Sequence, residues 1–266
     1  MNRTDRALKA KETLDIFGKG YYSKNNETIN CHSCFTTDFI SENELCKIAL
    51  SPGNFVPQYE VVNESVVDTV IRYPNCGVLN FASAKNPGGG FLNGAVAQEE
   101  CLTISSDLYM SLLTASQFYE INRRSGTALY TNNMIYSSNI SFIRNGRLEL
   151  LNKPIMANVL TSPAVNANAF YRNENGDALV VYSVMEQRIK HILNLFVTKG
   201  DRTIILGAFG CGVFGNDASD IAGIFKKLLI DEHLESHFEK IIFAIYDSGG
   251  KQYSLFKKTF NNIIVK

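Results

Sequence analysis

The sequence predicts an α/β fold in which helices cover both faces of a mixed β-sheet. Three runs are almost continuously apolar, as strands buried on both faces are: GVLNFA at residues 77–82, RTIILGAF at 202–209 and IIFAIY at 241–246. Segments with helical periodicity alternate with these runs along the chain. No repeat, low-complexity tract or Pro/Ser-rich linker interrupts the 266 residues, so we expect a single domain.

In the first part of the chain, apolar residues at helical spacing predict helices, and short apolar or alternating runs predict strands. In chain order we expect a helix at 6–17, a strand and loop at 26–35, a strand at 59–63, a helix at 64–71, the buried strand at 77–82 and one or two helices within 98–119. The helix at 64–71 should end before Pro74, because proline disfavours helical backbone in the residue preceding it.

The second part of the chain continues the alternation. We expect strands at 129–137 and 155–160, a long amphipathic helix at 178–196, the buried strand at 202–209, a helix at 221–230, the buried strand at 241–246 and a closing helix at 251–260. The buried strands at 77–82 and 202–209 both run directly into glycine-rich loops. Ligands of α/β sheets bind beyond the carboxyl ends of strands, so we expect the functional site at these loops.

The overall charge restricts the class of ligand. The chain carries 26 basic and 26 acidic side chains, so its formal net charge is zero, which argues against a broad nucleic-acid surface. A small anionic ligand fits, because backbone N–H groups bind phosphate without net positive charge. The charged N-terminus has no apolar signal segment and no run of about 18 apolar residues occurs, so we expect a cytoplasmic protein without a membrane span.

The two glycine-rich loops are NPGGGFLNG at 86–94 and GAFGCGVFGND at 207–217. Glycine lets backbone N–H groups approach a phosphate closely, and the N-terminus of a following helix adds its dipole. Each loop alone could equally be a tight turn between a strand and a helix. The two together, the first followed by Gln-Glu-Glu, favour a site for a ligand that carries a diphosphate.

The second loop also contains GCGVFG, which fits the dinucleotide pattern G-x-G-x-x-G. That pattern needs an acidic residue about 20 positions further on, and the strand-end candidate, Asp247, comes noticeably later. Too little chain follows the loop to complete a doubly wound sheet. We therefore interpret it as a phosphate loop. A dinucleotide-dependent oxidoreductase, which would bind NAD, remains the weaker alternative.

Glu99 and Glu100 are adjacent carboxylates that follow the first loop. Neighbouring residues of a helix point about 100° apart, so this pair cannot flank a glycosidic bond from two sides as in most glycosidases. One of them could act as acid and base while the other holds a hydroxyl. The structural alternative is a helix that begins with acidic residues, which the helix dipole favours.

Three glycines, a short spacer and Gln-Glu-Glu together resemble the signature of poly(ADP-ribose) glycohydrolases. The fuller string VLNFASAKNPGGGFLNGAVAQEECL resembles the microbial type of that family, which has a macrodomain fold. Thr13-Leu14 with Gly20-Tyr21, LTSPAVN at 160–166 and GAFGCGVFGND also resemble family segments. The resemblance implies a single macrodomain-type domain over residues 1–266 with an N-terminal helical extension, and no metal or other cofactor.

The resemblance also implies roles for individual residues. Glu100 would be the catalytic acid, and Glu99 would hold hydroxyls of the ribose that is cleaved. The remaining substrate-binding residues come from the loops and the signature: Asn86, Gly88, Gly89, Gly90, Gln98, Gly210, Cys211, Gly212, Val213 and Phe214. Among them, Asn86 would contact a ribose, the residues at 210–214 would wrap the diphosphate, and Phe214 would order the terminal ribose.

The implied activity is hydrolysis of ribose–ribose O-glycosidic bonds in poly(ADP-ribose), mainly from chain ends, with ADP-ribose as product. The polymer, free or attached to protein, would be the partner. One carboxyl would protonate the departing hydroxyl and then activate water, which requires a group that keeps its proton at neutral pH. Two alternatives stay open: a hydrolase that removes single ADP-ribose groups from protein or DNA, and a non-catalytic ADP-ribose-binding macrodomain.

Overall fold

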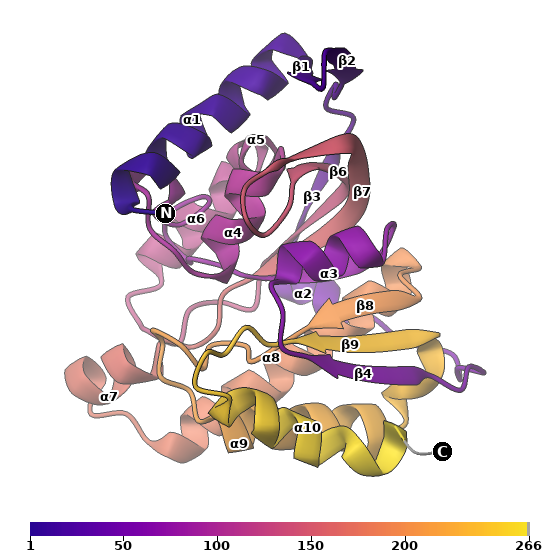
Figure 1. Ribbon diagram of the computed structural model, residues 1–266. Coiled ribbons are helices and arrows are strands. Elements are labelled where there is room, and N and C mark those ends of the chain that lie inside the picture. The colour runs from indigo at the N-terminus through magenta and orange to yellow at the C-terminus, as the bar shows by residue number, and fades with distance from the viewer. Residues whose placement is uncertain (265–266) are drawn as a thin grey trace.

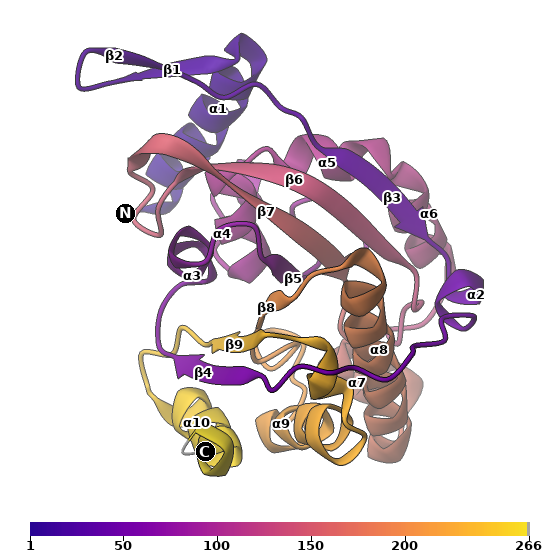
Figure 2. The ribbon, with the colours of Figure 1, turned by 90° about the vertical axis from the view of Figure 1, so that its right-hand side faces the viewer.

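The computed structural model describes residues 1–264 and contains a seven-stranded mixed sheet with helices on both faces (Figures 1 and 2). From one edge to the other, its strands are β3 (Thr36–Ile40), β6 (Met134–Arg144), β7 (Leu150–Ser162), β5 (Gly77–Phe81), β8 (Thr203–Leu206), β9 (Lys240–Ala244) and β4 (Gln58–Val62). A separate hairpin pairs β1 (Tyr21–Lys24) with β2 (Glu27–Asn30). The predicted α/β class is confirmed.

The direction of the strands determines where the loops meet. The strands from β7 to β4 run parallel to one another, whereas β6 is antiparallel to both β7 and β3. In the middle of the sheet, Val78 of β5 lies opposite Val159 of β7 and Ile205 of β8. The carboxyl ends of β5 and β8 therefore lie side by side at the same end of the parallel strands, and both glycine-rich loops begin there.

Two layers of helices bury the sheet. One face is covered by α3 (Val66–Arg72), α4 (Gln98–Ser105), α5 (Leu108–Thr114) and α6 (Ser116–Arg124). The other is covered by α2 (Glu42–Leu45), α7 (Ala167–Glu174), α8 (Ala178–Lys199), α9 (Ala218–Lys226) and α10 (Lys251–Ile264). Because successive side chains of a strand point to opposite faces, Val78 packs in the first layer and Leu79 in the second.

The remaining elements are one long helix and three short turns. Helix α1 (Arg3–Lys19) packs on α4 (Figure 1). It also packs on the single turn η1 (Phe91–Asn93), which follows the first glycines. The π-helical turn η2 (Lys227–Asp231) extends α9, and η3 (Leu234–His237) leads into β9. Among residues 1–264, no helix is both long and apolar enough to cross a membrane.

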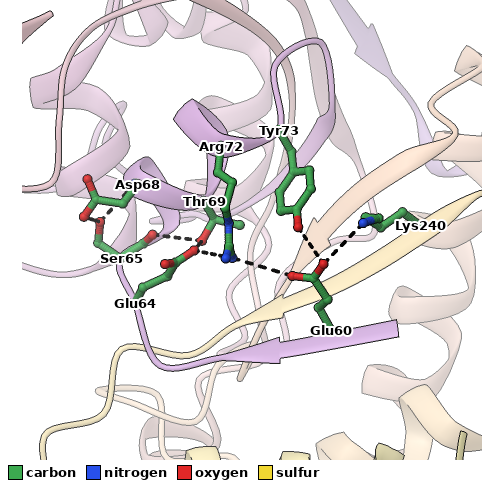
Figure 3. A network of polar contacts seen from close by, with 8 residues as sticks. All are labelled: Glu60, Glu64, Ser65, Asp68, Thr69, Arg72, Tyr73 and Lys240. Atoms are coloured by element: carbon green, nitrogen blue, oxygen red, sulfur yellow. Dashed lines mark hydrogen bonds and ion pairs between the residues drawn. The ribbon is translucent and has the colours of Figure 1, made fainter. Parts of the chain in front are cut away.

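A polar network joins α3 to the edge strand β4 and to its neighbour β9 (Figure 3). Glu60 of β4 accepts hydrogen bonds from the hydroxyl of Tyr73 and the ammonium of Lys240, and pairs with Arg72 at 3.7 Å. The same Arg72 donates to Glu64 at 2.6 Å. The ion-paired side chains of this network are partly exposed, so each ion pair adds little to the stability of the fold. The main effect of the network is to fix the position of α3 against the sheet.

Most of the expected helices and strands are found, although β7 begins at Leu150, before its expected start at 155, and the elements β1, β3, α2 and α7 were not predicted. Two further regions differ. The strand expected at 129–137 is β6, which begins only at Met134, because Tyr130 has a left-handed φ of 56° and the preceding residues form a loop. The region 98–119 holds parts of three helices. The extended Ser106 and the non-helical Ala115 separate them.

Candidate active site

The first glycine loop joins β5 to α4 and folds back on the two glutamates. The N–H of Gly89 donates to the carbonyl of Asn86 at 3.0 Å, which closes a tight turn. A Cβ on Gly89 would lie 2.3 Å from Oε1 of Glu100 and 3.1 Å from Oε2 of Glu99, and its φ is +60°. Only glycine fits there without a clash. Both carboxyl groups therefore lie close to the position of Gly89.

Glu99 points inward from the first turn of α4. Its side chain is 3% exposed, and Oε2 accepts a hydrogen bond from the N–H of Ser83 at 2.7 Å. The amide of Asn80, on buried strand β5, approaches Oε1 at 3.4 Å and donates to Thr161 at 3.1 Å. Burial raises the pKa of Glu99 to about 8, with a further increase from the charge of Glu100. At neutral pH this carboxyl is mainly protonated.

Glu100 points toward the loop. Its side chain is half-buried, and Oε1 accepts a hydrogen bond from the N–H of Gly90 at 2.8 Å. Since Glu99 and Glu100 lie about 100° apart around α4, one faces the sheet and the other faces the loop. A partly accessible carboxyl held by one backbone N–H can give a proton to a bound group and take one from water.

The Glu99→Gln variant is expected to change the pH dependence of stability. An unfolded Glu99 ionises near pH 4.5, whereas the folded protein keeps the proton until about pH 8. The folded state therefore binds more protons between these values, and the stability is lost as pH rises through this window. Glutamine removes the effect, so the variant should be more stable than wild type by about 2–4 kcal/mol at pH 8, with little difference at pH 4.5.

Thermal unfolding of both proteins from pH 4.5 to 9 measures this difference. The exposed Glu120 on α6 provides the control, because Glu120→Gln should follow the wild-type curve. Parallel curves for Glu99→Gln and wild type would show that Glu99 does not titrate in this range.

Gln98 and Asn86 have different surroundings from the glutamates. The side-chain amide of Gln98 spans the backbone of β5: its oxygen accepts from Phe81 N–H at 2.9 Å and its nitrogen donates to Leu79 at 2.6 Å. These bonds fix the start of α4 against the sheet. Asn86 is exposed at the start of the loop. Contact of either side chain with substrate stays a prediction.

The second loop joins β8 to α9 and presents its backbone outward. Gly210 and Cys211 form its inner part, where buried Asn216 donates to the carbonyl of Gly210 at 3.1 Å. Val213 is 84% exposed. Within residues 1–264, no backbone carbonyl accepts a hydrogen bond from the N–H groups of residues 212–214. Three successive free N–H groups suit an anion such as a phosphate.

Phe214 and Tyr130 connect the second loop to the loop before β6. Their ring centroids lie 6.2 Å apart. The guanidinium of Arg188, fully buried on α8, donates to the carbonyls of Leu129 at 2.9 Å, Tyr130 at 3.3 Å and Pro163 at 3.0 Å. Burial lowers the pKa of Arg188 to about 10, so it stays charged at neutral pH. The hydrogen bonds from this charged guanidinium fix the loop that places Tyr130 beside Phe214.

The family model described as "Microbial-type PARG, catalytic domain" matches residues 10–145, just over half of the chain. The chain belongs to this family. The matched range of the microbial-type PARG family contains the first glycine loop and both glutamates, whereas the second loop lies beyond it. No curated protein sequence matched the chain.

Solved structures of poly(ADP-ribose) glycohydrolases (PARGs) resemble this PARG-family chain over most of its length. PARG from Thermomonospora curvata is 31% identical, covers 97% of this chain and 100% of its own, and superposes with a TM-score of 0.90. The same protein bound to the inhibitor ADP-HPD has equal identity and coverage and a TM-score of 0.88. PARG from Deinococcus radiodurans with ADP-ribose is 32% identical over 85% of this chain and 95% of its own, with a TM-score of 0.79. The expected macrodomain-like fold is confirmed.

Three residues shape the site of this PARG-family protein although no sequence pattern singled them out. Asn80 carried a signal, because it is an amide within the apolar run GVLNFA and needs a buried partner. Ser83 acts through its backbone N–H, which no residue pattern reveals. Arg188 lies among other polar residues of a long helix, and only the packing of α8 shows that it is buried.

Proposed function

We propose that this protein hydrolyses the ribose–ribose O-glycosidic bonds of poly(ADP-ribose) and releases ADP-ribose. The observation that carries the proposal is the close approach of both Gln-Glu-Glu carboxyls to the position that a Cβ on Gly89 would occupy, in a chain of the microbial-type PARG family. The PARG from Deinococcus radiodurans contains ADP-ribose, and the PARG from Thermomonospora curvata contains ADP-HPD. We extend this ligand class to the present chain.

The substrate lies between the two loops in this proposal. The free N–H groups of residues 212–214 bind the diphosphate, and Phe214, supported by Tyr130, orders the terminal ribose. The first loop passes the ribose that is cleaved, close to Glu99 and Glu100. Asn86 contacts a ribose at the outer end of that loop. The bound diphosphate brings negative charge to the glutamate pair, which favours retention of a proton there.

The two glutamates have different roles in this proposal. Glu100 protonates the departing ribose hydroxyl while positive charge develops at the anomeric carbon, and the resulting carboxylate then takes a proton from the attacking water. Glu99 holds ribose hydroxyls. One carboxyl thus serves both steps.

Three finer points belong to the same proposal. We propose that release occurs mainly from chain ends, that residues 1–266 act as one domain with an N-terminal helical extension, and that the protein works in the cytoplasm. The polymer is the partner, free or attached to protein.

A polymer-degradation assay paired with calorimetric titration of ADP-ribose tests the function. We expect ADP-ribose to appear as the main product from the earliest times, without short oligomers, and ADP-ribose to bind. Binding without release would indicate a non-catalytic reader. Release only from mono-ADP-ribosylated protein or DNA would indicate a mono-ADP-ribosyl hydrolase. Tighter binding of NAD than of ADP-ribose, with hydride transfer, would indicate an oxidoreductase.

A further inference from the structure

Helix α1 contacts both of the elements that build the glutamate site. On the α4 side, the buried hydroxyl of Thr13 donates to the carbonyl of Ile104 at 2.8 Å. On the loop side, Ala10 is buried in a cluster with Phe91 of η1 and the same Ile104. Figure 1 shows α1 beside α4. One helix therefore sets how the glycine loop and α4 lie relative to each other.

Two arginines near the start of α1 hold the end of the glycine loop. Arg3 Nε donates to the carbonyl of Asn93 at 2.8 Å, and Arg6 Nε donates to the carbonyl of Gly94 at 2.9 Å. A Cβ on Gly94 would lie 2.0 Å from the carbonyl oxygen of Arg3, and the φ of Gly94 is +71°. Helix and loop are thus in direct backbone contact, and a side chain at position 94 would push them apart.

A single turn separates these arginines from the carboxyl of Glu100. The N–H groups of Asn93 and Ala95 donate to the carbonyl of Gly90 at 3.0 and 3.1 Å. The N–H of Gly90 in turn donates to Oε1 of Glu100 at 2.8 Å. Arg3 and Arg6 therefore hold one end of η1, and the other end of η1 binds the glutamate. Movement of the turn would move the hydrogen bond that orients Glu100.

We propose that Arg3 and Arg6 are positioning residues for Glu100, so that α1 forms part of the catalytic apparatus. The inference rests on the proposed function of Glu100. Both arginines precede residue 10, where the match to the family model begins, so that match assigns them no role. Charged donors make stronger hydrogen bonds to carbonyls than neutral ones, which suits residues that must hold a glycine-rich turn in place.

The double variant Arg3→Ala/Arg6→Ala tests the proposal. We expect kcat for ADP-ribose release to fall about 10- to 100-fold, because displacing a catalytic group by about 1 Å is enough for such a loss. The Kd for ADP-ribose should change by less than about threefold, since the second loop is untouched and the loss concerns the transition state. Arg3→Lys/Arg6→Lys keeps N–H donors at both positions and should recover most of the activity.

A matched control distinguishes positioning of Glu100 by the two arginines from electrostatic attraction between basic side chains of α1 and the negatively charged polymer. Lys11 and Lys19 are exposed on the same helix, so Lys11→Ala/Lys19→Ala removes the same charge and should leave kcat unchanged. Hydrogen exchange at the Gly90 amide gives a readout that needs no substrate. Exchange should be faster in the arginine double variant and unchanged in the lysine control. If the double variant does not fold, Arg3→Ala and Arg6→Ala are measured singly, each expected to have a smaller effect.

The outcomes distinguish the two proposals. Wild-type kcat and Gly90 protection in the arginine variants, alongside an active wild type, would overturn the positioning role and leave the proposed function standing. An equal loss of kcat in the lysine control would also overturn it. An inactive wild type would overturn the proposed function. In that case, the exchange rate at Gly90 still decides whether the arginines hold the turn.

Discussion

Glu100→Gln is expected to lower the rate of ADP-ribose release from poly(ADP-ribose) by about 10³-fold, within the range attributed to general acid–base catalysis. Glutamine keeps an oxygen that can accept the Gly90 N–H bond, now 2.8 Å long, so the loop should hold its shape. It has no proton to give to the departing hydroxyl and cannot activate water. Steady-state kinetics on labelled polymer measure the effect.

The affinity for ADP-ribose shows whether this variant has lost only the proton transfer or the binding site as well. The Kd of Glu100→Gln for ADP-ribose should lie within about threefold of the wild-type value, because binding of the ligand does not depend on the proton that Glu100 transfers. Glu120→Gln, an exposed substitution of the same kind on α6, should keep full activity. Substantial turnover by Glu100→Gln would show that Glu100 is not the catalytic acid and would favour Glu99 in that role.

Gly89→Ala is the second variant with a large expected effect. The added Cβ would lie 2.3 Å from Oε1 of Glu100, and the φ of +60° is unfavourable for alanine. Either the carboxyl or the loop must move, so we expect turnover to fall by about 100-fold or more. The left-handed backbone should also cost about 1 kcal/mol of unfolding free energy. Kinetics on polymer and thermal unfolding together measure both effects.

Gly200→Ala is the matched control for backbone strain. Gly200 ends α8 with a φ of +82°, and a Cβ there would meet no atom within 4 Å. It should show a stability loss similar to that of Gly89→Ala, with activity close to wild type. If both alanine variants lose stability and neither loses turnover, crowding at Gly89 does not matter for catalysis.

Much of the fold could be predicted because its strands are buried on both faces. The runs at 77–82, 202–209 and 241–246 are apolar throughout for that reason, and they became β5, β8 and β9. The start of β6 could not be predicted, since residues 129–133 are as suited to a strand as to a loop. The left-handed Tyr130 and the bonds from Arg188 decide it, and Arg188 lies over 50 residues away.

The candidate site, like the fold, could be predicted only in part from the sequence. The sequence by itself determined the two glycine loops, the adjacent glutamates and the family they resemble, because these depend on residue type and short spacing. Only the tertiary structure decided that burial raises the pKa of Glu99 while Glu100 faces the loop, and that Arg3 and Arg6 hold the far end of η1. Burial and hydrogen bonds between distant segments arise when helices pack on the sheet, and no local pattern encodes them.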